Sequence, residues 1–170
     1  MAELIARMAE LVASRRESDV LVAMGLGSCI GVALLDRASP VAVLAHVVLP
    51  EARSGTAVPG KFANTAVPEL IRQVSALGAA TSDLSAVLVG GAQMLPPRPN
   101  GSPDIGHRNE QAVRVALAAA GIAVAVAVTG GTSGRTMRIH VGTGVVAWTE
   151  AGTVDEAIAY RARTMLGVAA

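Results

Sequence analysis

The sequence predicts an α/β fold with a mixed sheet. Several apolar runs, rich in valine and leucine, have the length of strands buried on both faces, and polar or glycine-bearing turns separate them. Other, longer segments repeat their apolar residues at helical spacing. With 170 residues, of which 52% are hydrophobic, the chain can bury a substantial core, and we expect one domain over residues 1–170.

The first third of the chain predicts a helix followed by strands. Apolar residues at helical spacing indicate a helix over residues 4–12. Uninterrupted apolar runs then predict three strands, at 20–24, 29–35 and 41–49. Pro50 ends the last of them, and residues 36–40 have the composition of a turn.

The rest of the chain alternates between the two kinds of element. Helical spacing predicts helices at 62–77, 109–120 and 153–167, with Asn109 as the N-cap of the second. Shorter apolar runs predict strands at 86–89 and 122–128 and a hairpin of 136–141 with 145–149. Residues 95–107 form a long proline-rich loop, and loops of this length in compact domains are often functional.

Composition excludes several classes of protein. The net charge of +1 gives no reason to expect a nucleic-acid partner or an anionic membrane surface. One cysteine cannot form an intrachain disulfide, which suits a reducing compartment. Charged residues interrupt the N-terminus, so it does not resemble a signal peptide, and the apolar run at 115–128 is shorter than the ~20 residues of a membrane-spanning helix. We therefore expect a cytoplasmic protein without membrane insertion.

Cofactor and metal motifs are incomplete. The Gly25-x-Gly27 pattern has isoleucine at position 30, where a dinucleotide-binding loop needs glycine, and Phe62 stands where a phosphate-binding loop needs a hydroxyl. The histidines at 46, 107 and 140 show no metal-ligand spacing with Cys29. We expect neither a cofactor nor a metal.

The only cysteine lies next to a glycine-bearing turn. Cys29 begins one predicted strand and His46 lies near the end of the next. If the two strands pair antiparallel, position 29 lies near positions 43–47, which brings the imidazole within reach of the thiol. An adjacent imidazolium lowers a thiol pKa below about 8.5, and histidine can protonate a leaving group. The residues alone also fit a buried structural cysteine and a core histidine.

Six short motifs follow one another along the chain. They are Gly25–Ile30 (GLGSCI), Ala45-His46 with Leu49-Pro50, Gly60–Ala66 (GKFANTA), Gly90–Met94 (GGAQM), Ile105–Asn109 (IGHRN), and Gly130-Gly131 with Gly134-Arg135. In this combination the sequence resembles the CheD family of chemoreceptor glutamine deamidases, over about residues 20–147.

The resemblance implies a four-layer α/β/β/α sandwich with mixed sheets, like that of the deamidating-toxin cysteine hydrolases. It implies an amide hydrolase that converts glutamine side chains of chemoreceptor cytoplasmic regions to glutamate and releases ammonia during chemotaxis adaptation, with some methylesterase activity. A CheC-type phosphatase is a second implied partner. The family usually begins with a strand, which competes with the helix expected at 4–12.

The resemblance also assigns roles to residues. The nucleophile maps onto Cys29 and the histidine onto His46, and backbone amides around Gly27 and Ser28 are candidate oxyanion donors. The family's third catalytic residue, a threonine, is replaced by Ala23. Either another group orients the His46 ring, such as a backbone carbonyl, Thr129 or Ser133, or the chain is a catalytically weak module that docks on chemoreceptors or a CheC-type phosphatase.

Overall fold

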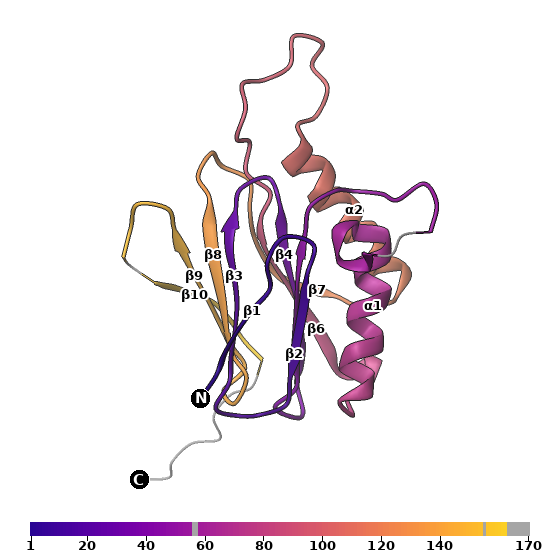
Figure 1. Ribbon diagram of the computed structural model, residues 1–170, viewed down its shortest axis with the longest axis vertical. Helices are drawn as coiled ribbons and strands as arrows, with labels where there is room; N and C mark the ends of the chain where they lie inside the picture. Colours follow the sequence, from indigo (N-terminus) through magenta and orange to yellow (C-terminus); the bar gives the residue numbers. More distant parts are fainter. Residues whose placement is uncertain (56–57, 155, 163–170) are drawn as a thin grey trace.

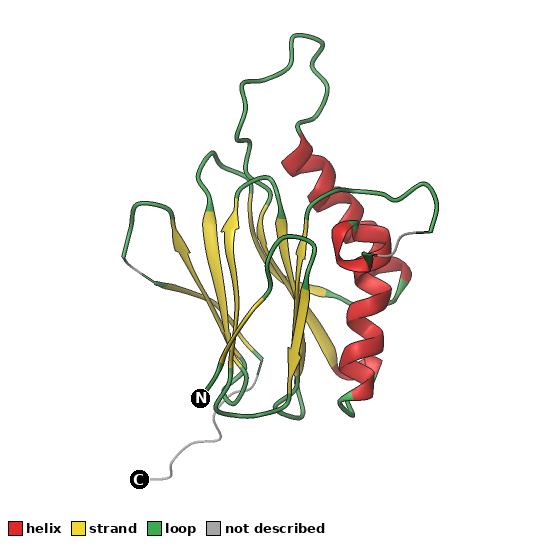
Figure 2. Cartoon of the chain, viewed as in Figure 1, coloured by secondary structure: helices red, strands yellow, loops and turns green. Residues whose placement is uncertain are grey.

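The computed structural model describes residues 1–55, 58–154 and 156–162. Within these ranges the chain forms ten strands and two α-helices, which Figures 1 and 2 show as layers. The strands are β1 (Glu3–Ile5), β2 (Leu11–Ser14), β3 (Val20–Leu26), β4 (Ile30–Asp36), β5 (Ala42–Val47), β6 (Leu84–Gly90), β7 (Val124–Thr129), β8 (Arg135–His140), β9 (Val145–Glu150) and β10 (Ala157–Arg161). The helices are α1 (Ala63–Ala76) and α2 (Ile105–Ala119), with 3-10 turns at Pro59–Lys61 and Thr81–Asp83.

Two five-stranded sheets pack against each other. One has the strand order β1-β3-β8-β9-β10, and the other has the order β2-β5-β4-β6-β7. Each contains one parallel pair, β1 with β3 and β6 with β7, among antiparallel pairs. The predicted α/β class with mixed sheets is therefore confirmed. Both helices lie against the second sheet, on the side away from the first (Figure 1).

The position of β4 at the centre of its sheet explains why residues 30–35 include no polar side chain. Successive side chains of a strand point to opposite faces of the sheet. Ile30, Val32 and Leu34 pack in the cluster under α1 and α2, whereas Ala33 and Leu35 pack between the two sheets. Because β4 is covered on both faces, all seven of its residues are buried.

The N-terminal segment corrects one prediction. Residues 4–12 form no helix; they contain β1 and β2, joined by a turn in which Ala9 has a φ of 68°. β1 pairs with β3 in one sheet and β2 pairs with β5 in the other, so tertiary pairing decides the conformation of this segment. The N-terminal strand implied by the family resemblance is correct.

Two helix predictions also need correction. α2 begins at Ile105, not after Asn109, because the Asp104 carboxylate accepts a hydrogen bond from the His107 amide at 3.1 Å and caps the helix. The helix expected at 153–167 is wrong over Ala157–Arg161, which form β10 at the edge of the first sheet, and residues 163–167 lie outside the described residues. The described chain thus contains three layers of the expected four-layer sandwich. None of its helices is long and apolar enough to cross a membrane.

Candidate active site

Cys29 and His46 lie at the same end of neighbouring strands. β4 and β5 pair antiparallel, with Ile30 opposite Val47 and Gly31 opposite His46, as the short turn between them predicts. Cys29, directly before β4, belongs to the apolar cluster between the sheets, and strand alternation with Leu44 places His46 on that same face. The structure therefore brings the two predicted residues to one face of one sheet.

Gly31, directly opposite His46 in the ladder, lets side chains of the other sheet approach β4 closely. A Cβ atom at position 31 would lie 2.9 Å from Leu26 Cδ1 and 3.0 Å from Met137 Sδ, both of which come from the opposite sheet. Any other residue would therefore push the sheets apart at this point.

The His46 ring is oriented by a backbone carbonyl. Its Nδ1 atom lies 3.3 Å from the Ala6 carbonyl oxygen. Because a carbonyl can only accept, Nδ1 carries the proton, and in the neutral ring the lone pair is on Nε2. Nε2 is buried and has no hydrogen-bond partner among the described residues. Burial lowers the pKa of His46, opposed in part by the Ala6 hydrogen bond, so the ring stays neutral and its Nε2 can accept a proton.

The thiol environment differs from the expected one. Cys29 is 9% exposed, and burial raises the pKa of its thiol above the ordinary 9.0. A lowered thiol pKa would need a charged imidazolium beside it, whereas burial keeps His46 neutral. Both pKa shifts favour a neutral thiol and a neutral imidazole over a thiolate–imidazolium pair.

Three consecutive carbonyl groups fix the loop that carries Cys29. The Gly27 carbonyl accepts a hydrogen bond from the Ala92 amide at 2.8 Å, and the Cys29 carbonyl accepts one from the Gly91 amide at 2.9 Å. The Ser28 carbonyl accepts the Asn109 side-chain amide at 2.9 Å. Residues of two other family motifs thus hold the loop that carries Cys29.

The amide groups of this loop divide into two kinds. The Gly27 amide donates to the Gly25 carbonyl at 2.9 Å, so it is already used. No hydrogen bond within the described ranges uses the amides of Ser28 or Cys29. Gly27 instead makes room for Met94, whose Cγ would lie 3.1 Å from a Cβ at that position.

The Gly90 turn contacts Cys29, and Arg135 joins this turn to the Gly130 turn. Gly90 has a φ of 121°, and a Cβ there would lie 2.2 Å from the Cys29 carbonyl oxygen, so only glycine fits. The buried Arg135 guanidinium donates through Nη1 to the Gly130 carbonyl at 2.8 Å and to the Gly90 carbonyl at 3.3 Å. Its centre lies 5.5 Å from the Trp148 ring centroid, a cation–π arrangement. Arg135 therefore stabilises the Gly90 turn, which lies against the Cys29 carbonyl.

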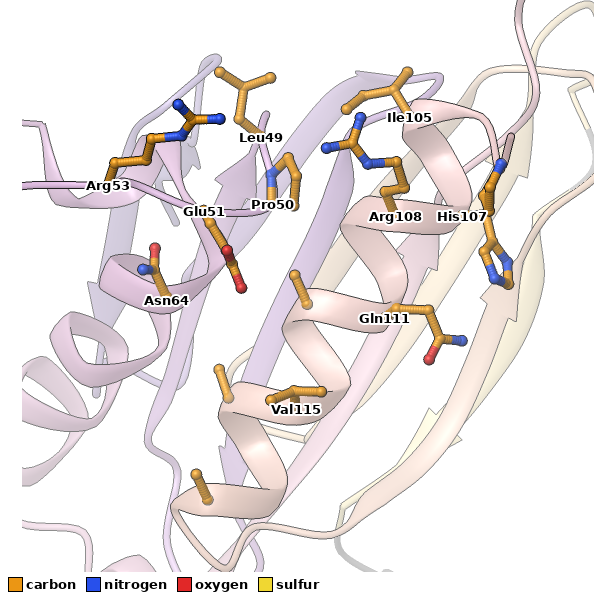
Figure 3. Close-up of a pocket in the computed structure, with 14 residues that line it drawn as sticks. Leu49, Pro50, Glu51, Arg53, Asn64, Ile105, His107, Arg108, Gln111 and Val115 are labelled. Carbon is orange, nitrogen blue, oxygen red and sulfur yellow. The ribbon is translucent and has the colours of Figure 1, made fainter. Parts of the chain in front are cut away.

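Two cavities lie near this end of the molecule. The larger, about 760 Å³, lies along α2 and does not include Cys29 or His46 in its lining. Figure 3 shows α2 side chains such as Arg108 on one side of it and Glu51, Arg53 and Asn64 on the other. The smaller, about 270 Å³, is lined by Ser28, Met94, Leu95, Pro96, Arg98, Asp104 and Ile105. Of these two cavities, only the smaller borders the loop that carries Cys29, through Ser28.

Neither hydroxyl candidate orients the histidine. Thr129 pairs with Gly90 at the end of β7, and Ser133 lies in the turn before β8. The Ala6 carbonyl is the partner of Nδ1, and Nε2 has no partner among the described residues. In those same ranges no group of three or more His, Cys, Asp or Glu side chains is arranged to hold a metal ion.

Sequence reasoning missed three contributors to the site. Ala6 acts through its carbonyl, which no side-chain pattern reveals. The sequence predicts that Arg108-Asn109 flank the site or its partner surface and favours a capping role for Asn109, but it does not reveal the bond of this side chain to the Ser28 carbonyl. Arg135 enters only as part of a motif. The signal for the last two was their place in motifs that contain both glycines and a polar side chain, since such motifs often hold backbone turns.

Comparisons with known proteins identify the family of this chain. A family model described as CheD, chemotactic sensory transduction, matches residues 48–150. A probable chemoreceptor glutamine deamidase CheD of Symbiobacterium thermophilum is 43% identical over 145 residues, which cover 82% of this chain and 87% of the relative. The chemoreceptor glutamine deamidase CheD of Thermotoga maritima is 38% identical over 125 residues, or 74% of this chain and 78% of the relative.

The family model begins after His46, but alignments to relatives extend further. A probable chemoreceptor glutamine deamidase CheD of Solibacter usitatus is 35% identical over 162 residues, with 93% of this chain and 95% of the relative covered. A share that large necessarily includes both Cys29 and His46. The chain belongs to the CheD family.

Proposed function

We propose that this protein hydrolyses glutamine side chains in the cytoplasmic region of a chemoreceptor to glutamate, with release of ammonia. The observation that carries the proposal is that Cys29 and His46 share one face at the same end of β4 and β5, with the ring tautomer set by Ala6. A histidine whose Nδ1 is tied to a carbonyl has its basic nitrogen free for a neighbouring nucleophile.

The reaction begins with the neutral pair. As the Cys29 sulfur attacks the carboxamide carbon of a receptor glutamine, its proton passes to His46 Nε2. The carbonyl oxygen becomes an oxyanion, for which the amides of Ser28 and Cys29 are the available donors. The carbonyl bonds at 27, 28 and 29 hold this loop in place before substrate arrives.

Breakdown of the tetrahedral intermediate then releases ammonia. His46 returns its proton to the departing nitrogen, the C–N bond breaks, and a glutamyl thioester remains on Cys29. Water attacks the thioester while His46 takes a proton from it. The C–S bond breaks, the sulfur recovers the proton, and the product is glutamate. Each step uses only the two side chains, the loop amides and water.

The experiment combines mass spectrometry with an ammonia assay on a chemoreceptor cytoplasmic fragment. The native protein is expected to convert glutamine to glutamate, seen as a gain of about one dalton because NH₂ becomes OH, with one ammonia per event. Cys29→Ala is expected to stop both signals and to cost roughly 1–2 kcal/mol of stability. Unchanged turnover in Cys29→Ala would rule out covalent catalysis by this thiol.

A second candidate function is a docking module for the receptor or for a CheC-type phosphatase. Ala23, in place of the family's threonine, is the observation that favours it. A receptor fragment that binds the native protein without ammonia release would support this function. Retained binding by Cys29→Ala would not separate the two candidates, so turnover by the native chain is the deciding measurement.

A further inference from the structure

We infer that Asn109 is a positioning residue that sets the relation between Cys29 and His46 through two backbone carbonyls. Its Nδ2 atom lies 2.9 Å from the Ser28 carbonyl oxygen and 2.9 Å from the Val48 carbonyl oxygen. Ser28 precedes the thiol residue, and Val48 follows His46 by two positions. The inference rests on the proposed function, because it concerns how that reaction is arranged.

The chemistry of the bridge admits few alternatives. Two carbonyl oxygens both accept, so they cannot bond to each other. An amide –NH₂ group has two donor hydrogens and no charge, so it can join both oxygens at once. This also fixes the orientation of the Asn109 amide, because its oxygen in the same place would face two acceptors.

The position of the bridge connects it to catalysis. The β4–β5 ladder has its last pair at Ile30 and Val47. Asn109 joins the two chain segments directly beyond that pair, where no backbone hydrogen bond between described residues links them to each other. Cys29 lies in the segment that this bridge ties down, and His46 is next to Val47. The separation of thiol and imidazole therefore depends on a side chain from α2.

Burial shields the two hydrogen bonds of Asn109 from water, but burying its amide group also costs free energy of folding. Asn109 is 0% exposed, and its Oδ1 atom has no hydrogen-bond partner among the described residues. An unpaired buried amide oxygen opposes folding. The helix position is set by Gly106, where a Cβ would lie 2.6 Å from the Gly91 and Ala92 carbonyl oxygens. α2 is thus seated against the Gly91 turn, and its next turn delivers Asn109 to the two strands.

The test compares Asn109→Asp and Asn109→Ala with Val113→Ala in the full chain. Asn109→Asp keeps the shape but removes both donors, and Asn109→Ala does so without adding a charge, at a helix position where alanine is well tolerated. Val113 is equally buried one helical turn later and packs in the apolar cluster between α2 and the second sheet, so Val113→Ala weakens the packing of the same helix without removing a hydrogen bond to the strands. All proteins are assayed well below their own melting temperatures.

Two readouts should move in opposite directions in the Asn109 variants. The kcat for ammonia release is expected to fall by roughly 10–100-fold with KM within about twofold, because misplacement of reacting groups affects the chemical step. Alkylation of Cys29 by iodoacetamide at pH 7 is expected to speed up, because a released loop exposes the thiol and relieves the burial that raises its pKa. Val113→Ala should change neither.

The outcomes are decisive in both directions. A kcat in both Asn109 variants within twofold of that of Val113→Ala would overturn the inference, and so would an alkylation profile identical to that of the native chain. Alkylation needs no receptor, so this arm still decides the role of Asn109 in holding the loop if the native chain releases no ammonia. In that case the proposed function fails separately.

Discussion

The Nδ1 atom of His46 donates a hydrogen bond to the carbonyl oxygen of Ala6, 3.3 Å away. This bond joins the end of β5 to the segment after β1, forty positions earlier in the chain. It sets the tautomer of the ring, because a carbonyl can only accept, and it restricts the orientation of the ring. The absence of threonine at position 23 therefore does not leave the histidine without an orienting partner.

Ala23→Thr is accordingly expected to give no gain in ammonia release. Ala23 is fully buried between the sheets, so a threonine would add volume and a hydroxyl to an apolar cluster. We expect a stability loss of about 1–3 kcal/mol. The measurements are turnover on one receptor fragment and thermal unfolding, with Ala23→Val as the control for added volume. A rise in kcat in the threonine variant would show that Ala6 is an incomplete substitute.

The pH dependence of Cys29 alkylation tests the neutral pair. Burial raises the pKa of Cys29, so the rate with iodoacetamide is expected to climb through a midpoint above 9.0, the ordinary thiol value. A rate that levels off below pH 8 would instead indicate a preformed thiolate–imidazolium pair.

The same shift makes a prediction for stability. Above pH 9 the unfolded thiol loses its proton while the folded thiol keeps it, so the unfolded state binds fewer protons. The contribution of Cys29 to stability is therefore present at neutral pH and lost as the pH rises through the folded-state pKa. Between pH 7 and 10 the free energy of unfolding of the native chain should therefore fall relative to that of Cys29→Ser. A constant difference between the two proteins would show that this titration does not contribute.

Gly90→Ala is expected to destabilise the protein at the loop that carries Cys29. The residue has a φ of 121°, and a Cβ would meet the Cys29 carbonyl oxygen at 2.2 Å. We expect a loss of about 3 kcal/mol or more, because backbone strain and a clash with backbone add together. Gly78→Ala is the matched control, since Gly78 also has a positive φ (100°) but nothing lies within 4 Å of its added Cβ. Equal losses in the two variants would mean that strain alone accounts for the effect.

Leu95→Ser tests whether receptor segments use the smaller cavity. Leu95 is 72% exposed and lines that cavity together with Ser28, so the change should leave the melting temperature unaltered. If a receptor side chain packs there, KM should rise about tenfold with kcat unchanged, which corresponds to the loss of roughly one buried aliphatic contact.

Val115→Ser provides the comparison for that experiment. Val115 is 69% exposed and lines the larger groove along α2. KM is expected to stay constant in this variant. A rise in KM for Val115→Ser but not for Leu95→Ser would place the receptor in the larger groove instead.

The sequence by itself determined the elements whose pattern is local. The apolar run at 30–35 predicted a strand covered on both faces, because apolar side chains occupy both of its faces. The short turn at 36–40 predicted the antiparallel pairing of β4 with β5, and with it the shared end of the sheet that holds Cys29 and His46. The ordered motifs identified the family, which the comparisons confirm.

Only the tertiary structure decided what depends on distant segments. Residues 4–12 have helical spacing, yet both ends of this segment belong to strands, because β3 and β5 offer edges whose hydrogen bonds a short isolated helix cannot match. Asparagine is a typical N-cap residue, yet the Asn109 side chain bridges the carbonyls of Ser28 and Val48, which lie 81 and 61 positions away in the chain. The protonation of the pair was likewise inaccessible from sequence. Proximity of a thiol and an imidazole favours charge separation, whereas burial opposes it, and the depth of burial is a property of the packed molecule.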